Sequence, residues 1–253
     1  MERKALLIII PAYNEEKNLE AFLKQLYQTK IRQIADILIV DDASLDDTGK
    51  IARRMGCIVV THIYNMGYGS GLQVGYKYAV EKGYDYVIQM DGDGQHDARN
   101  AELLYEKLKE GQSDIILGSR FLKGSRAYPI SAVKKTAYVL FRFLIRVGTG
   151  RRIMDPTTGL QAMNRRVFSF YAGFNHFDDQ YPDANMLMQM LLLGYQVAEV
   201  PSVMHERTEG VSMHSGFKPV IYMFRMMFSI LAVWVRVRMF HMDAGRADGT
   251  IIP

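Results

Sequence analysis

Residues 87–97 read VIQMDGDGQHD, an apolar run that ends in two aspartates separated by one glycine. Alternate residues of a strand point the same way, so Asp91 and Asp93 can converge beyond the end of a strand. The glycines let the backbone approach a ligand closely. Carboxylates at such a position suit Mg²⁺ or Mn²⁺, and a cation there can hold a diphosphate and neutralise it as it leaves. Because paired aspartates also occupy ordinary surface turns, the surrounding sequence decides between the two interpretations.

Five short apolar runs alternate with stretches of helical periodicity along the first 120 residues. The expected strands cover residues 6–10, 37–40, 58–61, 86–90 and 114–117, and the expected helices cover 15–27, 46–55, 69–82 and 100–109. Strands that are apolar on both faces and alternate with helices predict an α/β fold with a mostly parallel, Rossmann-like sheet flanked by helices. In such sheets ligands bind beyond the carboxyl ends of the strands.

Composition and missing motifs narrow the class of protein. The 253 residues suffice for one sizeable α/β domain, and the single cysteine, Cys57, excludes an internal disulfide and fits a reducing compartment. No uncharged apolar stretch reaches the roughly 18 residues of a spanning helix. The glycines at 67, 69, 71 and 75 do not form G-x-G-x-x-G, and P-loop and kinase signatures are missing. We therefore disfavour dinucleotide-binding, P-loop and kinase proteins.

Positive charge is concentrated in residues 115–154, which contain no Asp or Glu. The nine basic residues are Arg120, Lys123, Arg126, Lys134, Lys135, Arg142, Arg146, Arg151 and Arg152. The whole chain carries +4, so the remainder sums to −5. This segment predicts a localised anionic partner: phosphate groups, an anionic membrane surface or nucleic acid. No nucleic-acid-binding module is recognisable, so we expect no nucleic-acid partner.

Seven segments, in order, resemble the family-two glycosyltransferases of GT-A fold, in particular polyprenyl-phosphate sugar transferases such as dolichyl-phosphate mannose and glucose synthases. They are IIIPAYNEEKN (8–18), ILIVDDASLDDTG (37–49), NMGYGSGLQVGYKYA (65–79), IQMDGDGQHD (88–97), ILGSRF (116–121), DPTTGLQAMNRRVF (155–168) and HERTEGVS (205–212). The resemblance covers residues 5 to about 215. It implies an inverting transferase that moves a hexose or N-acetylhexosamine from a UDP- or GDP-sugar.

The resemblance also implies roles for individual residues. Pro11, Tyr13 and Glu15 would frame the nucleotide, Asp41 or Asp42 would hold its base or ribose, and Asn65, Gly67, Arg207 and Ser212 would complete the donor site. Asp91, Asp93 and Gln95 would hold Mg²⁺ or Mn²⁺, and Arg120 would contact phosphate. Simpler roles compete with some of these. Glu15 can cap its helix, Asn65 and Gly67 can shape a turn, and Asp46 and Asp47 are better explained as helix-start residues.

The resemblance implies a polyprenyl-phosphate acceptor, and the charge pattern agrees with a phosphate. A phosphate monoester has a second pKa of about 6, so it needs positive charge to hold it rather than a base to activate it. The basic segment supplies that charge, and Arg120, Lys123, Arg126 and Lys135 are our candidates for binding a polyprenyl phosphate. Apolar residues from 137 to 145 fall on one face of an expected helix. That helix and residues 219–240 predict peripheral contact with the inner face of a membrane, or with a second subunit.

Two alternatives stay open. The segment FDDQYPDAN, residues 177–185, offers Asp183 as a catalytic base, with Asp179 behind it, for a sugar hydroxyl on a growing cell-surface polysaccharide. Asp183 can instead cap an expected helix at 184–193. The second alternative is a non-catalytic nucleotide-sugar-binding protein.

The expected organisation is a catalytic domain over 1–215, with a nucleotide-binding half at 1–118 and an acceptor-binding half at 119–215. An apolar helix at 216–242 and a tail at 243–253 follow. We expect a cytoplasmic protein that is peripherally attached to the membrane.

Overall fold

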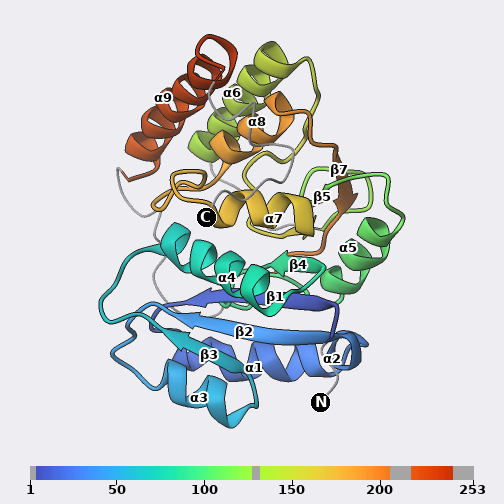
Figure 1. Ribbon diagram of the computed structural model, residues 1–253, viewed down its shortest axis with the longest axis vertical. Helices are drawn as coiled ribbons and strands as arrows, with labels where there is room; N and C mark the ends of the chain where they lie inside the picture. The colour runs from blue at the N-terminus through green and yellow to red at the C-terminus, as the bar shows by residue number, and fades with distance from the viewer. Residues whose placement is uncertain (1–3, 127–131, 206–217, 242–253) are drawn as a thin grey trace.

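The computed structural model describes residues 4–126, 132–205 and 218–241. Within these ranges the strands form one sheet in the order β3-β2-β1-β4-β6-β5-β7 (Figure 1). The strands are β1 (Leu6–Ala12), β2 (Ala35–Asp41), β3 (Ile58–Thr61), β4 (Tyr86–Gln89), β5 (Ile115–Ser119), β6 (Gln161–Asn164) and β7 (Val197–Pro201). The five strands expected from the sequence are all present, and the sheet adds β6 and β7.

Strand β6 is the exception to an otherwise parallel sheet. It runs antiparallel to both of its neighbours, β4 and β5, whereas the other paired strands are parallel. The expectation of a mostly parallel sheet is therefore confirmed. Because β6 runs in the opposite direction, the loop that enters it lies at the same edge as the carboxyl ends of β4 and β5. This edge therefore receives one more loop than a purely parallel sheet would place there.

Helices cover both faces of the sheet, as the alternating pattern predicted. One face carries α1 (Glu16–Tyr27), α2 (Ile31–Ile34), α3 (Thr48–Arg54) and α5 (Asn100–Lys109), and the other carries α4 (Tyr68–Lys82) and α7 (Arg165–Ala172). Strand β1 shows why both faces of the sheet are buried. Its residues Leu6, Ile8 and Ile10 enter one core, and Leu7 and Ile9 enter the other.

Three further helices pack together over the second core, at the top of Figure 1. They are α6 (Ala132–Thr149), α8 (Ala184–Leu192) and α9 (Lys218–Arg238). Apolar side chains also remain on the outer surfaces of two of them: Val139, Phe143 and Val147 on α6, and Ile221, Phe224, Phe228 and Leu231 on α9. None of the helices in the described ranges is long and apolar enough to cross a bilayer.

Candidate active site

The loops that follow β1 and β2 are joined into one rim by hydrogen bonds. Asn14 donates its backbone N–H to the Ser44 hydroxyl at 3.0 Å, and its side-chain oxygen accepts from Leu45 N–H at 2.8 Å. Glu15 N–H donates to the Thr48 hydroxyl at 2.8 Å. Asp46 accepts from the backbone N–H and hydroxyl of Thr48 at the start of α3, which confirms it as a helix-start residue.

The side chains predicted to frame a nucleotide lie on or beside this rim. Pro11 is half-buried one residue before β1 ends at Ala12, and Tyr13, which follows the strand, is 45% exposed. Glu15 occupies the position before α1 but does not cap it with its side chain, which accepts instead from Asn18 at 2.8 Å. The structure thus gathers Pro11, Tyr13 and Glu15 at one edge of the sheet.

The paired aspartates after β2 have different surroundings, although both are buried. Asp42 accepts from the backbone N–H groups of Met66 and Gly67, both at 2.8 Å, and lies 2.6 Å from His62 Nδ1. It therefore anchors the turn before α4. Asp41 accepts one backbone N–H, from Ser44 at 3.0 Å. Of the two predicted alternatives, Asp41 is the one less committed to the loop backbone.

The glycine-rich start of α4 packs against the backbone of residues 178–179. Gly67 takes a φ of 93°, where glycine is favoured. Ser70 N–H donates to the backbone oxygen of Asp179 at 2.9 Å, and a Cβ on Gly69 would lie 2.4 Å from the backbone oxygen of Asp178. The first turn of α4 thus receives the 178–179 loop, while Asn65 is exposed ahead of it. Gly69 is required by this close approach, which couples the predicted donor and acceptor sides.

Asp91, directly beyond β4, is held from three sides. Its Oδ1 accepts from the Tyr68 hydroxyl at 2.9 Å, and its Oδ2 lies 3.4 Å from Nε2 of the buried His96. A Cβ on Gly159 would meet Oδ2 at 2.8 Å, so glycine leaves room for the carboxylate. Burial alone would raise the pKa of Asp91, but His96, Tyr68 and Arg120 outweigh it and hold that pKa below its ordinary value. Asp91 is therefore an ionised, oriented carboxylate.

Asp93 and Gln95 belong to a turn that pairs with the chain beyond β7. Asp93 Oδ1 accepts from Gln95 N–H at 3.0 Å, and the backbone oxygen of Gln95 accepts from His205 N–H at 2.8 Å. His205 Nε2 also lies 3.2 Å from Asp97. Residues 95–97 and 203–205 are thus fastened together. Arg207 and Ser212, which follow directly, lie outside the described residues.

The donor set fits a divalent cation that a substrate helps to ligate. Asp91 and Asp93 provide two half-buried carboxylates beyond one strand, and Gln95 adds an amide oxygen in the same loop. The described residues contain no cluster of three or more His, Cys, Asp or Glu that could cage a metal alone. Mg²⁺ is commonly bound by one or two carboxylates together with substrate phosphates. This loop therefore matches a cation that arrives with a diphosphate.

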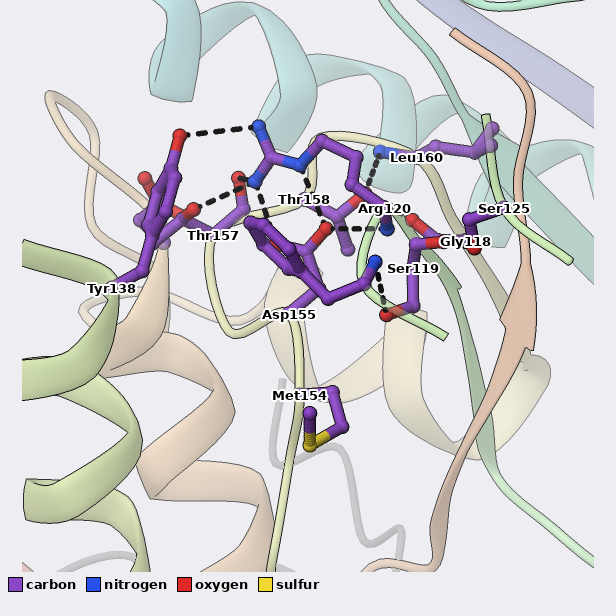
Figure 2. Close-up of polar contacts among 12 residues, drawn as sticks. Gly118, Ser119, Arg120, Ser125, Tyr138, Met154, Asp155, Thr157, Thr158 and Leu160 are labelled. Atoms are coloured by element: carbon purple, nitrogen blue, oxygen red, sulfur yellow. Dashed lines mark hydrogen bonds and ion pairs between the residues drawn. The ribbon is translucent and has the colours of Figure 1, made fainter. Parts of the chain in front are cut away.

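Arg120, just after β5, forms a nearly enclosed ion pair with Asp155 (Figure 2). Its Nε and Nη2 donate to the two carboxylate oxygens at 2.7 and 2.6 Å, and Nη2 also donates to the Thr157 hydroxyl at 2.9 Å. Nη1 lies 3.4 Å from the Tyr138 hydroxyl. Burial alone would lower the pKa of Arg120, but the hydrogen bonds to Asp155 raise it above its ordinary value. Nη1 is the guanidinium nitrogen that makes no contact with Asp155 or Thr157 and donates to Tyr138 instead.

A second layer fixes this ion pair. Glu199 on β7 accepts from the backbone N–H groups of Met154 and Asp155, at 2.7 and 2.8 Å. Arg142 of α6 lies 4.3 Å from the centre of the Phe121 ring, and burial lowers its pKa. Because Asp155 neutralises Arg120, the net positive charge of this region comes from the other basic residues. Lys123, Arg126 and Lys135 are exposed.

Asp183 directly precedes α8 and lies close enough to Arg120, Asp155 and Asp91 to feel their charges. Its side chain does not cap the helix and accepts instead from the Tyr222 hydroxyl of α9. Burial raises the pKa of Asp183 to about 7, although the hydrogen bond from Tyr222 and the charge of Arg120 oppose that rise. Asp91 and Asp155 are near enough to raise it further. Asp183 thus shares an electrostatic environment with the loop after β4 and the Arg120 ion pair.

Several residues of this centre were not singled out from the sequence. They are Tyr68, His96, Asp155, Thr157, Gly159, Glu199 and Tyr222. A signal was available for five of them, since Tyr68, His96, Asp155, Thr157 and Gly159 lie in segments that carry the family resemblance; Asp155 is also the first carboxylate after the acid-free basic segment. Tyr222 gave none, because it stands in an apolar helix far along the chain. These residues orient carboxylates and guanidinium groups through contacts that only the folded chain creates.

The sheet order, its antiparallel β6 and the two-aspartate loop beyond β4 define a GT-A-type fold of the kind that uses nucleotide-sugars. The chain belongs to the family described as glycosyl transferase family 2, whose model matches residues 7–171. It is similar to a polyprenol monophosphomannose synthase from Mycolicibacterium smegmatis, with 30% identity over 227 residues, 83% of this chain and 81% of that protein. The resemblance stated from the sequence motifs is confirmed.

Two further proteins are similar to this chain and agree with this family assignment. A dolichol-phosphate mannosyltransferase from Pyrococcus furiosus is 30% identical over 237 residues, 87% of this chain and 63% of that protein. Glucosyl-3-phosphoglycerate synthase from Mycobacterium tuberculosis, solved with Mn²⁺, UDP-glucose and phosphoglyceric acid, superposes with a TM-score of 0.66. At 17% identity, over 91% of this chain and 80% of that one, this structural likeness establishes the fold alone.

Proposed function

We propose that this glycosyltransferase moves a hexose or N-acetylhexosamine from a UDP- or GDP-sugar to a polyprenyl phosphate, with inversion at the anomeric carbon. The observation that carries the acceptor is the pair of neighbouring helices α6 and α9, which keep apolar side chains exposed beside a basic segment without carboxylates. An acceptor with an isoprenoid tail and a phosphate head matches both features. Two similar proteins, named above, bear names with polyprenol or dolichol phosphate substrates.

On the donor side, the rim beyond β1 and β2 would receive the nucleotide. Tyr13 offers an exposed ring for stacking, and Asp41 offers a carboxylate for the base or ribose. Asp91, Asp93 and Gln95 would hold Mg²⁺ or Mn²⁺, which neutralises the diphosphate when bound. Tyr68 and Gly159 keep the Asp91 carboxylate in place for that task. Arg207 and Ser212 remain predicted contacts of the departing diphosphate.

On the acceptor side, a phosphate oxygen would attack the anomeric carbon from the face opposite the diphosphate. The bond from that carbon to the diphosphate oxygen breaks as the new bond forms. The acceptor is already largely ionised at neutral pH, so positioning and charge do most of the work. Arg120 would present Nη1 from its rigid ion pair, and Lys123, Arg126 and Lys135 would add exposed positive charge.

Asp183 supports a second candidate function, transfer to a sugar hydroxyl. A hydroxyl must lose its proton during attack, and a carboxylate with a pKa near the working pH is suited to accept it. The pKa of about 7 and the position near Arg120 and Asp91 meet that requirement. For a phosphate acceptor, Asp183 would instead shape the pocket.

One assay separates these candidates. The purified protein would be incubated with Mn²⁺ or Mg²⁺, radiolabelled UDP- and GDP-sugars and undecaprenyl phosphate, and label in the organic phase would be counted. Label in the lipid with one donor supports the phosphate acceptor. Slow, metal-dependent donor hydrolysis without lipid label favours a hydroxyl acceptor and Asp183 as base. If the protein bound the donor but neither transferred nor hydrolysed it, the result would favour a non-catalytic nucleotide-sugar-binding protein.

Membrane contact can be tested separately. Phe224 and Phe228 are 52% and 63% exposed on α9, so replacing both with Asp removes apolar surface without opening the core. Burying a phenylalanine is worth about 1.5–3 kcal/mol, so we expect at least a tenfold loss of binding to phosphatidylglycerol vesicles in flotation assays. Replacing the exposed Leu45 with Asp, in the β2–α3 loop, provides the control. Unchanged flotation of the α9 variant, or its conversion from dimer to monomer, would assign this face to a subunit interface instead.

A further inference from the structure

The hydroxyl of Tyr222 reaches Asp183 from a helix that the catalytic motifs do not include. Tyr222 lies on the inner side of α9, and its hydroxyl donates to Asp183 Oδ2. The ring is fixed by edge-on contacts with Phe141 of α6 and Tyr181 of the 178–183 loop, with centroids 6.3 and 6.0 Å away. The rotamer of Tyr222 is therefore set by packing, which leaves the hydroxyl to orient the carboxylate.

Asp183 has few other means of orientation among the described residues. Its backbone groups are engaged, since its N–H donates to Asn185 Oδ1 at 2.8 Å and its oxygen accepts from Met186 and Leu187 at 3.0 and 3.2 Å. Its side chain makes no helix-capping bond. Across the site, Asp91 is oriented in the same way by the hydroxyl of Tyr68. Two carboxylates of the centre are thus each held by one tyrosine.

We infer that Tyr222 is a positioning residue for Asp183, so that α9 completes the acceptor side of the active site. The inference deepens the proposed function and rests on it for the identity of the acceptor. It gives α9 two different faces. The inner face holds a carboxylate of the site, and the outer face presents Ile221, Phe224 and Phe228 to its surroundings.

Tyr222→Phe tests this inference, because it keeps the ring and removes the hydroxyl alone. Ser229→Ala is the matched control. Ser229, two turns further along α9, accepts from Asn185 of α8 at 2.9 Å, so this change also removes one α8–α9 hydrogen bond but spares the Asp183 carboxylate. We expect Tyr222→Phe to lower kcat at least tenfold with an unchanged donor KM, and Ser229→Ala to behave as the unaltered enzyme.

The pH profile separates positioning from general weakening. Several groups from neighbouring elements influence Asp183: the Tyr222 hydroxyl, the cation Arg120, the carboxylates Asp91 and Asp155, and Tyr68. Tyr138 in turn influences Tyr222. All except the Tyr222 hydroxyl persist in Tyr222→Phe. Since that hydrogen bond favours the ionised carboxylate, its loss should raise the pKa of Asp183, and an activity limb that disappears in Asp183→Asn should move upward by about one pH unit. In the Asp183→Asn background, Tyr222→Phe should have no further effect on kcat.

Melting temperatures measured across pH report on the Asp183 carboxyl without any substrate. A carboxyl whose folded pKa lies near 7, above its unfolded value, lowers stability as the pH rises between the two values. In Tyr222→Phe that decline should extend to higher pH, while Ser229→Ala should follow the unaltered protein. A kcat, a pH profile and a melting profile that match the unaltered protein would overturn the inference. Absence of lipid label in the unaltered enzyme would defeat the proposed acceptor, while the melting profiles still decide whether Tyr222 holds Asp183.

Discussion

Gly159→Ala is the sharpest test of the proposed cation site, because it adds one methyl group directly against Asp91. The new Cβ would lie 2.8 Å from Oδ2 and 3.2 Å from Oδ1. Ordinary contacts begin at 3.4 Å, so the carboxylate must move by about 0.6 Å. Tyr68 and His96 hold the carboxylate on its other sides, so this movement breaks the existing arrangement.

A shift of this size is large for a metal ligand. Ligand distances in metal sites are held to about 0.2 Å, and loss of a supporting contact typically reduces metal affinity or activity about 10- to 100-fold. We expect the Mn²⁺ concentration for half-maximal donor turnover to rise by about that factor. Calorimetry of Mn²⁺ and UDP binding should show the same loss without any turnover.

Gly75→Ala separates this effect from ordinary destabilisation. Its Cβ would meet Ile9 Cγ2 at 2.4 Å, a comparable overlap within the core of the sheet and α4. It should lower the melting temperature, since overpacking typically costs about 1–3 kcal/mol, and leave the Mn²⁺ requirement unchanged. If Gly159→Ala keeps the Mn²⁺ requirement of the unaltered protein, Asp91 does not hold the cation.

Three other changes give distinct outcomes. Asp93→Asn should abolish transfer without lowering the melting temperature, and full activity in that variant would remove Asp93 from the cation site. Arg120→Met leaves Asp155 buried without its partner, so urea unfolding should show a loss of about 3–5 kcal/mol; a loss below 1 kcal/mol would contradict a buried ion pair. Asp183→Asn should stabilise the protein by on the order of 1 kcal/mol above pH 7 and not below pH 4, because only ionisation of the buried carboxyl is unfavourable. Melting temperatures across that range check the sign.

The elements that the sequence predicted are those with a strong local pattern. Strands such as 6–10 and 37–40 are continuously apolar because both faces are buried, and that signal does not depend on their neighbours. Strand β6 has no comparable signal, since Gln161–Asn164 is short and mixed in polarity. It becomes a strand because β4 and β5 both pair with it. Its presence and direction are therefore properties of the folded sheet.

The candidate site likewise contains some residues that a local pattern predicted and others that only folding brings together. Asp91 and Asp93 stand next to each other in a motif, so their shared position could be predicted from the alternation of side chains along a strand. The partner of Arg120 is Asp155, 35 residues away, and the partner of Asp183 is Tyr222, 39 residues away. Such pairs depend on how β6 and α9 are placed. Sequence patterns locate the chemical groups, and packing decides their orientation and protonation.

The antiparallel strand β6 also restricts how this protein can be recombined with its relatives. Adjacent strands lie about 4.8 Å apart, so β6 separates β4 from β5 by about 10 Å. Its entry loop, residues 155–160, serves both neighbours: Gly159 lies against Asp91, while Asp155 and Thr157 hold Arg120. A chimera joined within this loop would take the two sets of contacts from different parents. Functional junctions should therefore fall outside residues 155–164, with the loop and β6 inherited as one unit.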